Sequence, residues 1–295
     1  MYLSGVPAND SVGLVLEGGG MRGAFTAGVL DCFLDHEIDL SYVIGVSAGA
    51  NAGANYVVAQ RERNHRMFVE LAADSRYAGW SNVLRERSWF GMRFLFETAP
   101  DEVAPFDYET LARARKRLLV VATDCASGLP AYFSSQDSDP RWFIHKVNRA
   151  SCSIPLLSPP VKIDGRRYLD GGVSDPIPIG RAIDDGNARN VVVLTRNAGY
   201  RKSHDRWDSL LNLLVAGYPG IRRASSRRAD VYNASLDTLD ALEQEGKVFV
   251  IRPLEPLAVD RLERDTGKLE ALYQQGHGEA SERIAALRSW LCDGH

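Results

Sequence analysis

The sequence lacks closely spaced metal-binding residues. Its four cysteines, Cys32, Cys125, Cys152 and Cys292, lie far apart in the 295-residue chain, and neither CxxC nor HExxH occurs. A structural zinc site is therefore not expected. Scattered thiols of this kind suit the reducing conditions of the cytoplasm.

The sequence also has little net charge and no long apolar run. A formal net charge of −3 gives no basic field of the kind that drives nucleic-acid binding, so nucleic acid is not an expected partner. No apolar run approaches the ~18 residues of a membrane span, and the opening MYLSGVPANDSVG does not resemble a signal peptide. The composition, 45% hydrophobic and 25% charged, is typical of a globular protein, which we expect in the cytoplasm.

Strand and helix patterns alternate at the start of the chain. The apolar run Val12 to Leu16 enters a glycine-rich turn, and helical spacing follows over residues 24–34. A second apolar run over 41–46 precedes a small-residue helix. This βαβα order predicts a three-layer α/β/α fold with a mainly parallel central sheet.

Later segments add to this sheet. Strand patterns occur at 117–122 and 188–197, a helix is expected over 142–150, and VKIDGRRYL predicts a hairpin that turns on Asp164-Gly165. Residues 62–114 have a helical pattern, interrupted by the aromatic stretch SWFGMRFLFETAP at 88–100. This stretch is either a lid or membrane-facing patch or part of the core, and we favour the core.

The character of the chain changes near residue 200. Beyond it the sequence is more helical and more charged, with KVFVIRP as an expected edge strand and an amphipathic helix around 283–291. We therefore expect a catalytic domain over 10–200 and an α-rich C-terminal extension over 201–295 that packs on it.

Gly45-Val46-Ser47-Ala48-Gly49 at the end of the second strand pattern matches GxSxG, the nucleophile elbow. Flanking glycines, Gly45 and Gly49, relieve the crowding of a sharp strand-to-helix turn. The serine hydroxyl then projects from the carboxyl end of the sheet, where the next helix offers its N-terminal dipole. We predict that Ser47 is a nucleophile.

The glycine-rich turn runs Gly18-Gly19-Gly20-Met21-Arg22-Gly23. Its GxGxxG pattern also occurs in dinucleotide-binding folds, but those need an acidic residue at the end of the second strand, where this chain has the serine elbow. The amides of Gly19, Gly20 and Met21 are better placed to stabilise an oxyanion beside Ser47. Arg22 is expected to add a charge-assisted donor or to hold the turn to a carboxylate.

A serine nucleophile needs a base. The six histidines are His36, His65, His145, His204, His277 and His295, and none follows a strand in an evident loop. Asp170 comes directly after a strand and before Gly171 and Gly172, which allow a sharp turn. A buried aspartate is basic enough to accept the serine proton. Asp124, at the end of LLVVATD, is a second candidate, and the pattern alone does not separate the two.

Four motifs together resemble the patatin-like phospholipases: GGGMRG at 18–23, GVSAG at 45–49, ASCSIP at 150–155 and DGG at 170–172. The third departs from the family's ASxAxP block, because Ser153 stands where alanine is common. The resemblance covers about 10–200. It implies a Ser47–Asp170 dyad without histidine, an oxyanion hole at 18–23, and hydrolysis of lipid acyl esters with no metal or other cofactor.

The expected partner is a lipid acyl ester, with peripheral contact at the inner membrane surface as a further expectation. Basic clusters at 113–117 and 222–228 offer charges for anionic headgroups, although we favour their interpretation as solvated surface. Two alternatives stay open: a Ser-His-Asp esterase, with His204 the least implausible base, and a nucleotide-binding module without catalysis. The sequence does not predict the oligomeric state.

Overall fold

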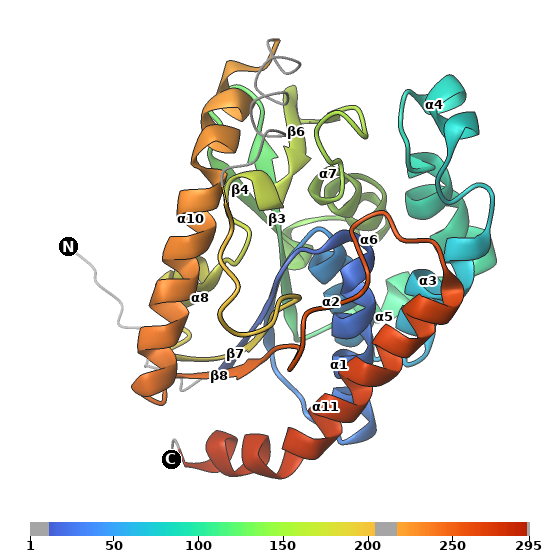
Figure 1. Ribbon diagram of the computed structural model, residues 1–295. Helices are drawn as coiled ribbons and strands as arrows, with labels where there is room; N and C mark the ends of the chain where they lie inside the picture. Colours follow the sequence, from blue (N-terminus) through green and yellow to red (C-terminus); the bar gives the residue numbers. More distant parts are fainter. Residues whose placement is uncertain (1–11, 204–216, 294–295) are drawn as a thin grey trace.

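A computed structural model of the chain describes residues 12–203 and 217–293, in which one twisted sheet lies between two layers of helices (Figure 1). The strands are β1 (Val12–Leu16), β2 (Tyr42–Val46), β3 (Arg117–Asp124), β4 (Pro130–Ser134), β5 (Val161–Ile163), β6 (Arg166–Asp170), β7 (Arg189–Val193) and β8 (Val248–Ile251). The α-helices are α1 (Gly23–Asp35), α2 (Ala48–Val57), α3 (Arg63–Phe68), α4 (Trp80–Glu86), α5 (Tyr108–Arg113), α6 (Pro140–Trp142), α7 (Arg149–Ser151), α8 (Ile179–Asp184), α10 (Pro219–Gln244) and α11 (Thr266–Cys292). Two π-helical segments span Phe94–Val103 and Phe143–Asn148.

The strand order within this sheet is β5-β6-β3-β2-β1-β7-β8, with β4 also paired to β3. The ladders between β3, β2, β1, β7 and β8 are all parallel, whereas β4, β5 and β6 join antiparallel. The predicted three-layer α/β/α fold with a mainly parallel sheet is confirmed. The edge strand expected in KVFVIRP is β8, so the sheet continues past residue 200, and the domain boundary there stays a prediction.

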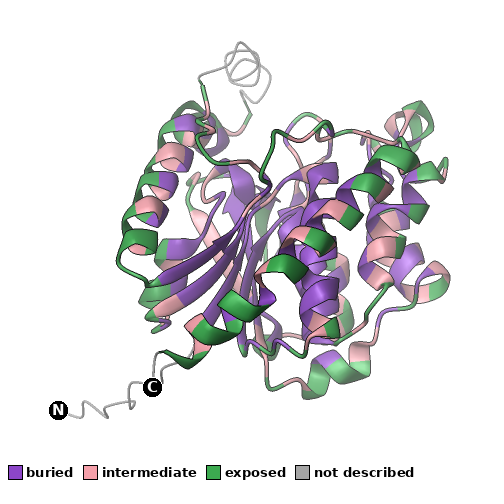
Figure 2. Cartoon of the chain, turned by 60° about the horizontal axis from the view of Figure 1, so that its bottom comes forward, coloured by how far each residue is buried: buried purple, intermediate pink, exposed green. Residues whose placement is uncertain are grey.

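Side-chain alternation along the strands forms the two halves of the core. On β1, Leu14 and Leu16 join the cluster that includes α1, α2 and α11, whereas Val15 joins the cluster that includes α8 and α10. A strand buried on both faces in this way reads as a continuous apolar run. Figure 2 shows the buried strands between helices whose outer faces are exposed.

Several local predictions are confirmed. The hairpin between β5 and β6 turns on Asp164 and Gly165, which both have positive φ (46° and 82°), as a type I′ turn requires. Phe90, Phe94 and Phe96 of the aromatic stretch are buried, so this segment belongs to the core. The closing helix is longer than expected, because α11 begins at Thr266. None of the described helices is long and apolar enough to cross a membrane.

Helix α11 crosses α1 at very short range (Figure 1). A Cβ on Gly28 of α1 would overlap the carbonyl oxygen of Tyr273, and a Cβ on Gly276 of α11 would overlap that of Phe25. The hydroxyl of Tyr273 also donates to Asp31 of α1 at 2.8 Å. Because both glycines lie in the contact, neither helix can carry a side chain there without moving the other.

We therefore expect Gly276→Ala to lower the free energy of unfolding by about 1–3 kcal/mol, since overpacking separates the two helices. Gly278, two residues further on, has no atom within 4 Å of its Cβ position. Gly278→Ala should raise stability by up to about 1 kcal/mol through helix propensity. Urea denaturation of both variants tests this, and equal effects would contradict the close crossing.

Candidate active site

Ser47 stands on a strained turn between β2 and α2. Its φ of 54° and ψ of −121° lie in a region that non-glycine residues avoid, at a cost of about 1–3 kcal/mol. A Cβ on Gly45 would lie 2.7 Å from the Ala50 nitrogen, and one on Gly49 would lie 2.6 Å from the Glu17 carbonyl oxygen. Glycine at both positions therefore lets α2 start directly against the strand ends. Ser47 is only 6% exposed.

A second serine supports this turn. The Ser47 N–H donates to Ser151 Oγ at 2.8 Å, and the Ser151 hydroxyl donates to the Val121 carbonyl at 2.6 Å. Ser151 thus ties the elbow to the neighbouring strand β3. The sequence contains Ser151 within ASCSIP, but its partner is 104 residues away, and nothing in the local pattern indicates the contact.

The register of β3 determines where Asp170 lies. Strand β2 pairs with β3 as far as Val46↔Val121, and the next residue of β3, Ala122, pairs with Asp170 of β6. Ala122 also pairs with Ala131 of β4, which therefore occupies the opposite edge. Strand β6 therefore pairs with the same edge of β3 as β2 does, and its pairing begins where that of β2 ends. Asp170 thus comes next to the end of β2, where Ser47 stands.

The Asp170 carboxylate is buried, with 7% of the residue exposed. Its Oδ1 accepts the Gly172 N–H at 2.7 Å. Burial raises the pKa of Asp170, while hydrogen bonding from Ser47 and Gly172 and the positive charges of Arg228 and Arg261 oppose the rise. The net result is a carboxylate more basic than an ordinary aspartate and close to the Ser47 hydroxyl.

Asp124, the other candidate base, is occupied in its own turn. Its Oδ1 accepts the N–H groups of Ala126 and Ser127 at 3.0 and 2.8 Å and the Ser127 hydroxyl at 3.0 Å. Burial alone would raise the pKa of Asp124, but these hydrogen bonds outweigh it, so the net shift is downward. The structure therefore brings Ser47 and Asp170 together and leaves Asp124 as a turn cap.

The glycine-rich turn passes beside Ser47. A Cβ on Gly18 would lie 3.3 Å from that of Ser47, and Gly20 has a φ of 59°. A 3₁₀ turn over Gly20–Arg22 then leads into α1 at Gly23, whose own Cβ would lie 2.7 Å from that of Ala48. The turn and the elbow are thus in direct contact.

One expected oxyanion donor, the Met21 N–H, has a backbone partner in the structure. The Met21 N–H donates to the Arg261 carbonyl at 3.2 Å, so it is already paired. Within the described ranges the amides of Gly18, Gly19 and Gly20 donate to no other residue. These three amides, rather than that of Met21, are available to a ligand at the helix N-terminus.

Arg22 and Glu17 are two buried charged residues behind this turn. Burial lowers the pKa of Arg22 to about 10, and the negative charge of Glu17 partly offsets that effect. The two Glu17 carboxylate oxygens accept from the Tyr232 hydroxyl at 2.9 Å and the Thr195 N–H at 2.6 Å. The Arg22 guanidinium itself makes no hydrogen bond or ion pair with a described residue.

Residues far along the chain support the site. Arg228 of α10 donates from Nε to the Gly172 carbonyl at 2.7 Å, beside the Asp170 carboxylate. Gly171 is fixed from the other side, since a Cβ there would overlap the Val121 carbonyl. Tyr232 donates a hydrogen bond to Glu17, and the Arg261 carbonyl accepts one from the Met21 N–H. The region after residue 217 therefore contacts both the loop that follows Asp170 and the glycine-rich turn. Sequence reasoning did not identify these residues.

The described histidines have partners elsewhere. His65 contacts Glu270 at 2.5 Å, His145 contacts Asp101 at 3.1 Å and His277 contacts Asp35 at 2.9 Å. His36 is the C-cap residue of α1. His204 and His295 lie outside the described residues. In the ranges that the structure covers, no group of His, Cys, Asp and Glu is arranged to hold a metal ion.

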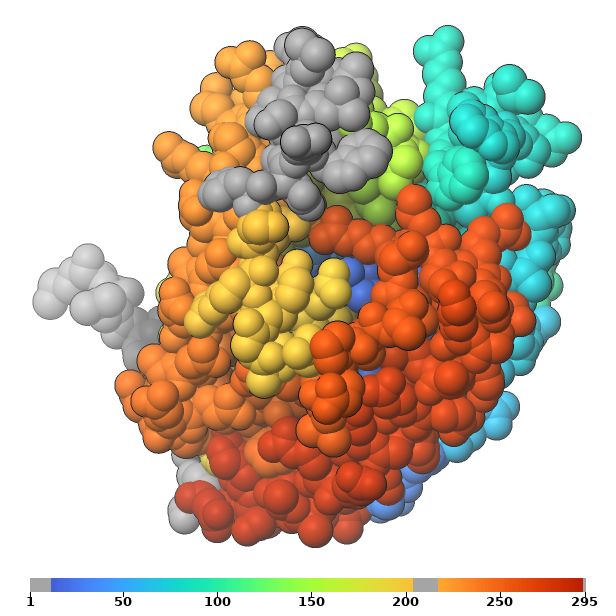
Figure 3. Space-filling view, in the orientation of Figure 1, coloured from blue at the N-terminus to red at the C-terminus, as the bar shows by residue number. Residues whose placement is uncertain are grey.

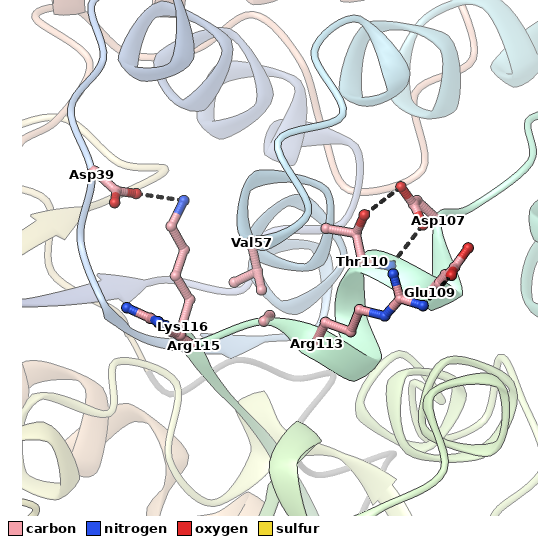
Figure 4. Close-up of a pocket in the computed structure, with 9 residues that line it drawn as sticks. Asp39, Val57, Asp107, Glu109, Thr110, Arg113, Arg115 and Lys116 are labelled. Atoms are coloured by element: carbon pink, nitrogen blue, oxygen red, sulfur yellow. Dashed lines mark hydrogen bonds and ion pairs between the residues drawn. The ribbon is translucent and has the colours of Figure 1, made fainter.

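Two pockets differ in their relation to Ser47. A pocket of about 380 Å³ lies where β3 begins, at the opposite end of the sheet, and Figure 4 shows the Asp39–Lys116 ion pair at its edge. Arg113 and Lys116 there are paired with Glu109 and Asp39, which fits solvated surface. A cavity of about 50 Å³ begins at Asn51, one turn after Ser47. Apolar side chains dominate its lining, among them Phe68, Leu95 and Phe96.

The support from Ser151 predicts a local loss of stability when it is removed. Ser151→Ala leaves the Ser47 N–H and the Val121 carbonyl without their partner, so the free energy of unfolding should fall by about 1–3 kcal/mol. Ser225 is a matched control, because it is equally buried but its hydroxyl has no partner. Ser225→Ala should be neutral or stabilising in denaturant titrations. If the two variants behaved alike, the Ser151 contact would not support the elbow.

Comparison with known proteins identifies two matching family models and several similar chains. The model of a family described as "Patatin-like phospholipase" matches residues 14–183, and that of a "Domain of unknown function (DUF6363)" matches 218–292. The protein YjjU of Escherichia coli (strain K12) is 30% identical over 217 residues, which are 69% of this chain and 59% of that protein. "Lysophospholipase nte1" of Aspergillus terreus is 26% identical over 95% of this chain but only 18% of its own length.

"Lysophospholipase NTE1" of Candida albicans is similar, at 25% identity over 98% of this chain and 21% of its own length. The chain thus spans only a part of these curated relatives. The structure of VipD from Legionella pneumophila matches 94% of this chain and 67% of that chain, with a TM-score of 0.52 and 13% identity, which supports the fold. Since the first family model covers more than half of the sequence, this chain belongs to the patatin-like phospholipase family.

Proposed function

We propose that this protein is a serine hydrolase that cleaves acyl esters of lipids. Ser47 would be the nucleophile, Asp170 the base, and the amides of Gly19 and Gly20 the oxyanion donors. The observation that carries the proposal is the register of β3, which sets a buried carboxylate next to a serine on a strained elbow. No metal or other cofactor enters this scheme.

The reaction proceeds in two halves. Asp170 accepts the proton of the Ser47 hydroxyl while Oγ attacks the ester carbonyl, and the carbonyl oxygen gains its negative charge beside Gly19 and Gly20. Collapse expels the alcohol, which takes the proton from Asp170 and leaves an acyl group on Ser47. Water then loses its proton to Asp170 and attacks the acyl group. The acid departs, and Ser47 regains its proton.

The substrate that we propose is a phospholipid or lysophospholipid. The names of the fungal relatives favour a lysophospholipid, and the small apolar cavity that begins at Asn51 is suited to the start of an acyl chain. That cavity is small, so short-chain esters are the appropriate first probes. We place the protein in the cytoplasm, in contact with the inner membrane surface.

Peripheral membrane contact is supported by α4 rather than by the aromatic stretch at 88–100. Trp80 and Leu84 lie one turn apart on this helix and are 75% and 87% exposed. Arg85 and Arg87 beside them are also exposed. An exposed tryptophan and leucine with flanking positive charge suit the interface of an anionic bilayer.

The dyad predicts large kinetic losses at two positions. Ser47→Ala and Asp170→Asn should each reduce kcat on a short-chain p-nitrophenyl ester by about 10³- to 10⁴-fold, as in other serine hydrolases. Asp124→Asn, which alters a turn cap, should retain most of the activity.

Full activity in Asp170→Asn together with its abolition in His204→Ala would instead indicate a histidine-dependent triad. Saturable NAD binding without ester hydrolysis would support a nucleotide-binding module.

The base also predicts the pH dependence. Asp170 accepts a proton only when ionised, and because burial raises its pKa, kcat/KM should fall as the pH drops through that raised value. Arg228 opposes the rise, so Arg228→Gln should raise the pKa further and move the acid limb to higher pH. Arg227→Gln, at an exposed neighbour, serves as control. Identical acid limbs in the two variants would argue against Asp170 as the base.

A further inference from the structure

Two arginines, Arg196 and Arg261, flank the glycine-rich turn. Arg196 follows Thr195, and a Cβ on Gly19 would lie 2.9 Å from Thr195 Oγ1. Arg261 contacts the turn through its backbone, which accepts the Met21 N–H. Figure 3 shows the chain after β7 in yellow and the chain after β8 in red-orange on either side of a small blue area of N-terminal residues.

Neither arginine forms an ion pair with a residue that the structure describes. No described carboxylate lies within 4.0 Å of the side chain of Arg196 or Arg261, and both residues are half-buried. Arg196 stacks on the Tyr200 ring at 4.5 Å, which holds its guanidinium without neutralising it. Such arginines contrast with the paired basic residues near the start of β3.

Buried polar groups in the same place also lack partners. Arg22 is 3% exposed, and its Nε is buried without a hydrogen bond. The hydroxyl of Thr195 is buried and unpartnered as well. Unsatisfied buried donors are costly, and a bound ion is one way in which a native structure satisfies them.

The charge balance around the turn is positive. Arg261 and Arg196 are close enough to Arg22 that their charges help to lower its pKa, after the larger effect of burial. Glu17 is the carboxylate with the largest effect on the Arg22 pKa, and its oxygens already accept from Tyr232 and Thr195. Glu17 acts on Arg22, and the charge of Arg261 also acts on Asp170, so three guanidinium groups face two carboxylates here. An anion at this position would compensate the excess charge.

We propose that Arg22, Arg196 and Arg261 bind a phosphate group beside the oxyanion turn. This inference rests on the proposed function, because the phosphate of a lysophospholipid lies only a few bonds from the ester that Ser47 would attack. Guanidinium groups match phosphate oxygens in pairs of hydrogen bonds, which lysine does not provide. The site would select esters that carry a phosphodiester over neutral esters. Free inorganic phosphate has the same chemistry and would compete for it.

The test compares two substrates with the same acyl chain, a 1-acyl lysophosphatidylcholine and a 1-monoacylglycerol, both below their critical micelle concentrations. For Arg196→Gln and Arg261→Gln the ratio of kcat/KM between the two substrates should fall at least about tenfold, mainly through KM. Arg196→Lys should recover only part of the ratio. Arg222→Gln, at an exposed arginine of α10, is the control and should keep the wild-type ratio.

Calorimetric titration with inorganic phosphate adds a readout that needs no activity. A lower substrate ratio together with weaker phosphate binding in Arg196→Gln would identify the lipid headgroup as the ligand. Weaker phosphate binding with an unchanged ratio would identify free phosphate instead. An equal loss on both substrates, or no change in either readout, would overturn the phosphate site. Absence of hydrolysis of both substrates by the wild type would count against the proposed function and leave the titration to test the site.

Discussion

The candidate site depends on one edge of strand β3, which two strands share end to end. Strand β2 occupies this edge up to Val121, and β6 takes over at Ala122, running in the opposite direction. Ser47 at the end of the parallel strand β2 thus lies next to Asp170 at the end of the antiparallel strand β6. The Val121 carbonyl also accepts the Ser151 hydroxyl, which in turn accepts the Ser47 N–H. A shift of one residue in either ladder would separate serine and carboxylate and would exchange the side chains that face the two halves of the core.

Neighbouring charges and burial adjust the pKa values of the residues that this register brings together. Burial raises the pKa of Asp170, and hydrogen bonds from Ser47 and Gly172 together with the charge of Arg228 oppose that rise. On the other side of Ser47, Glu17 offsets part of the positive charge of Arg22. Residues from the region that matches the domain of unknown function take part at both places. Arg228 donates to the Gly172 carbonyl beside Asp170, and Tyr232 donates to Glu17. That region also supplies β8 to the sheet and a helix to each face, so we regard it as part of the site's framework.

The sequence predicts those parts of the site that arise from local patterns. Strand, glycine turn and helix at the start, the GxSxG elbow, the Asp164-Gly165 hairpin and the edge strand β8 all follow from periodicity and turn chemistry within about ten residues. Contacts between distant segments could not be predicted in this way. Tyr232 meets Glu17 across 215 residues and Ser151 meets Ser47 across 104, and neither residue stands in a pattern that indicates its partner. The pairing of Met21 with Arg261 is of the same kind, and no local pattern indicates it.

We propose above all that Ser47 is an activated nucleophile beside Asp170. The most direct measurement is labelling of the intact protein with a fluorophosphonate, followed by mass mapping of the modified peptide. We expect one adduct, on Ser47, formed much more slowly in Asp170→Asn but at an unchanged rate in Asp124→Asn. An adduct on another residue, or labelling of Ser47 at the same rate without the Asp170 carboxylate, would contradict the account.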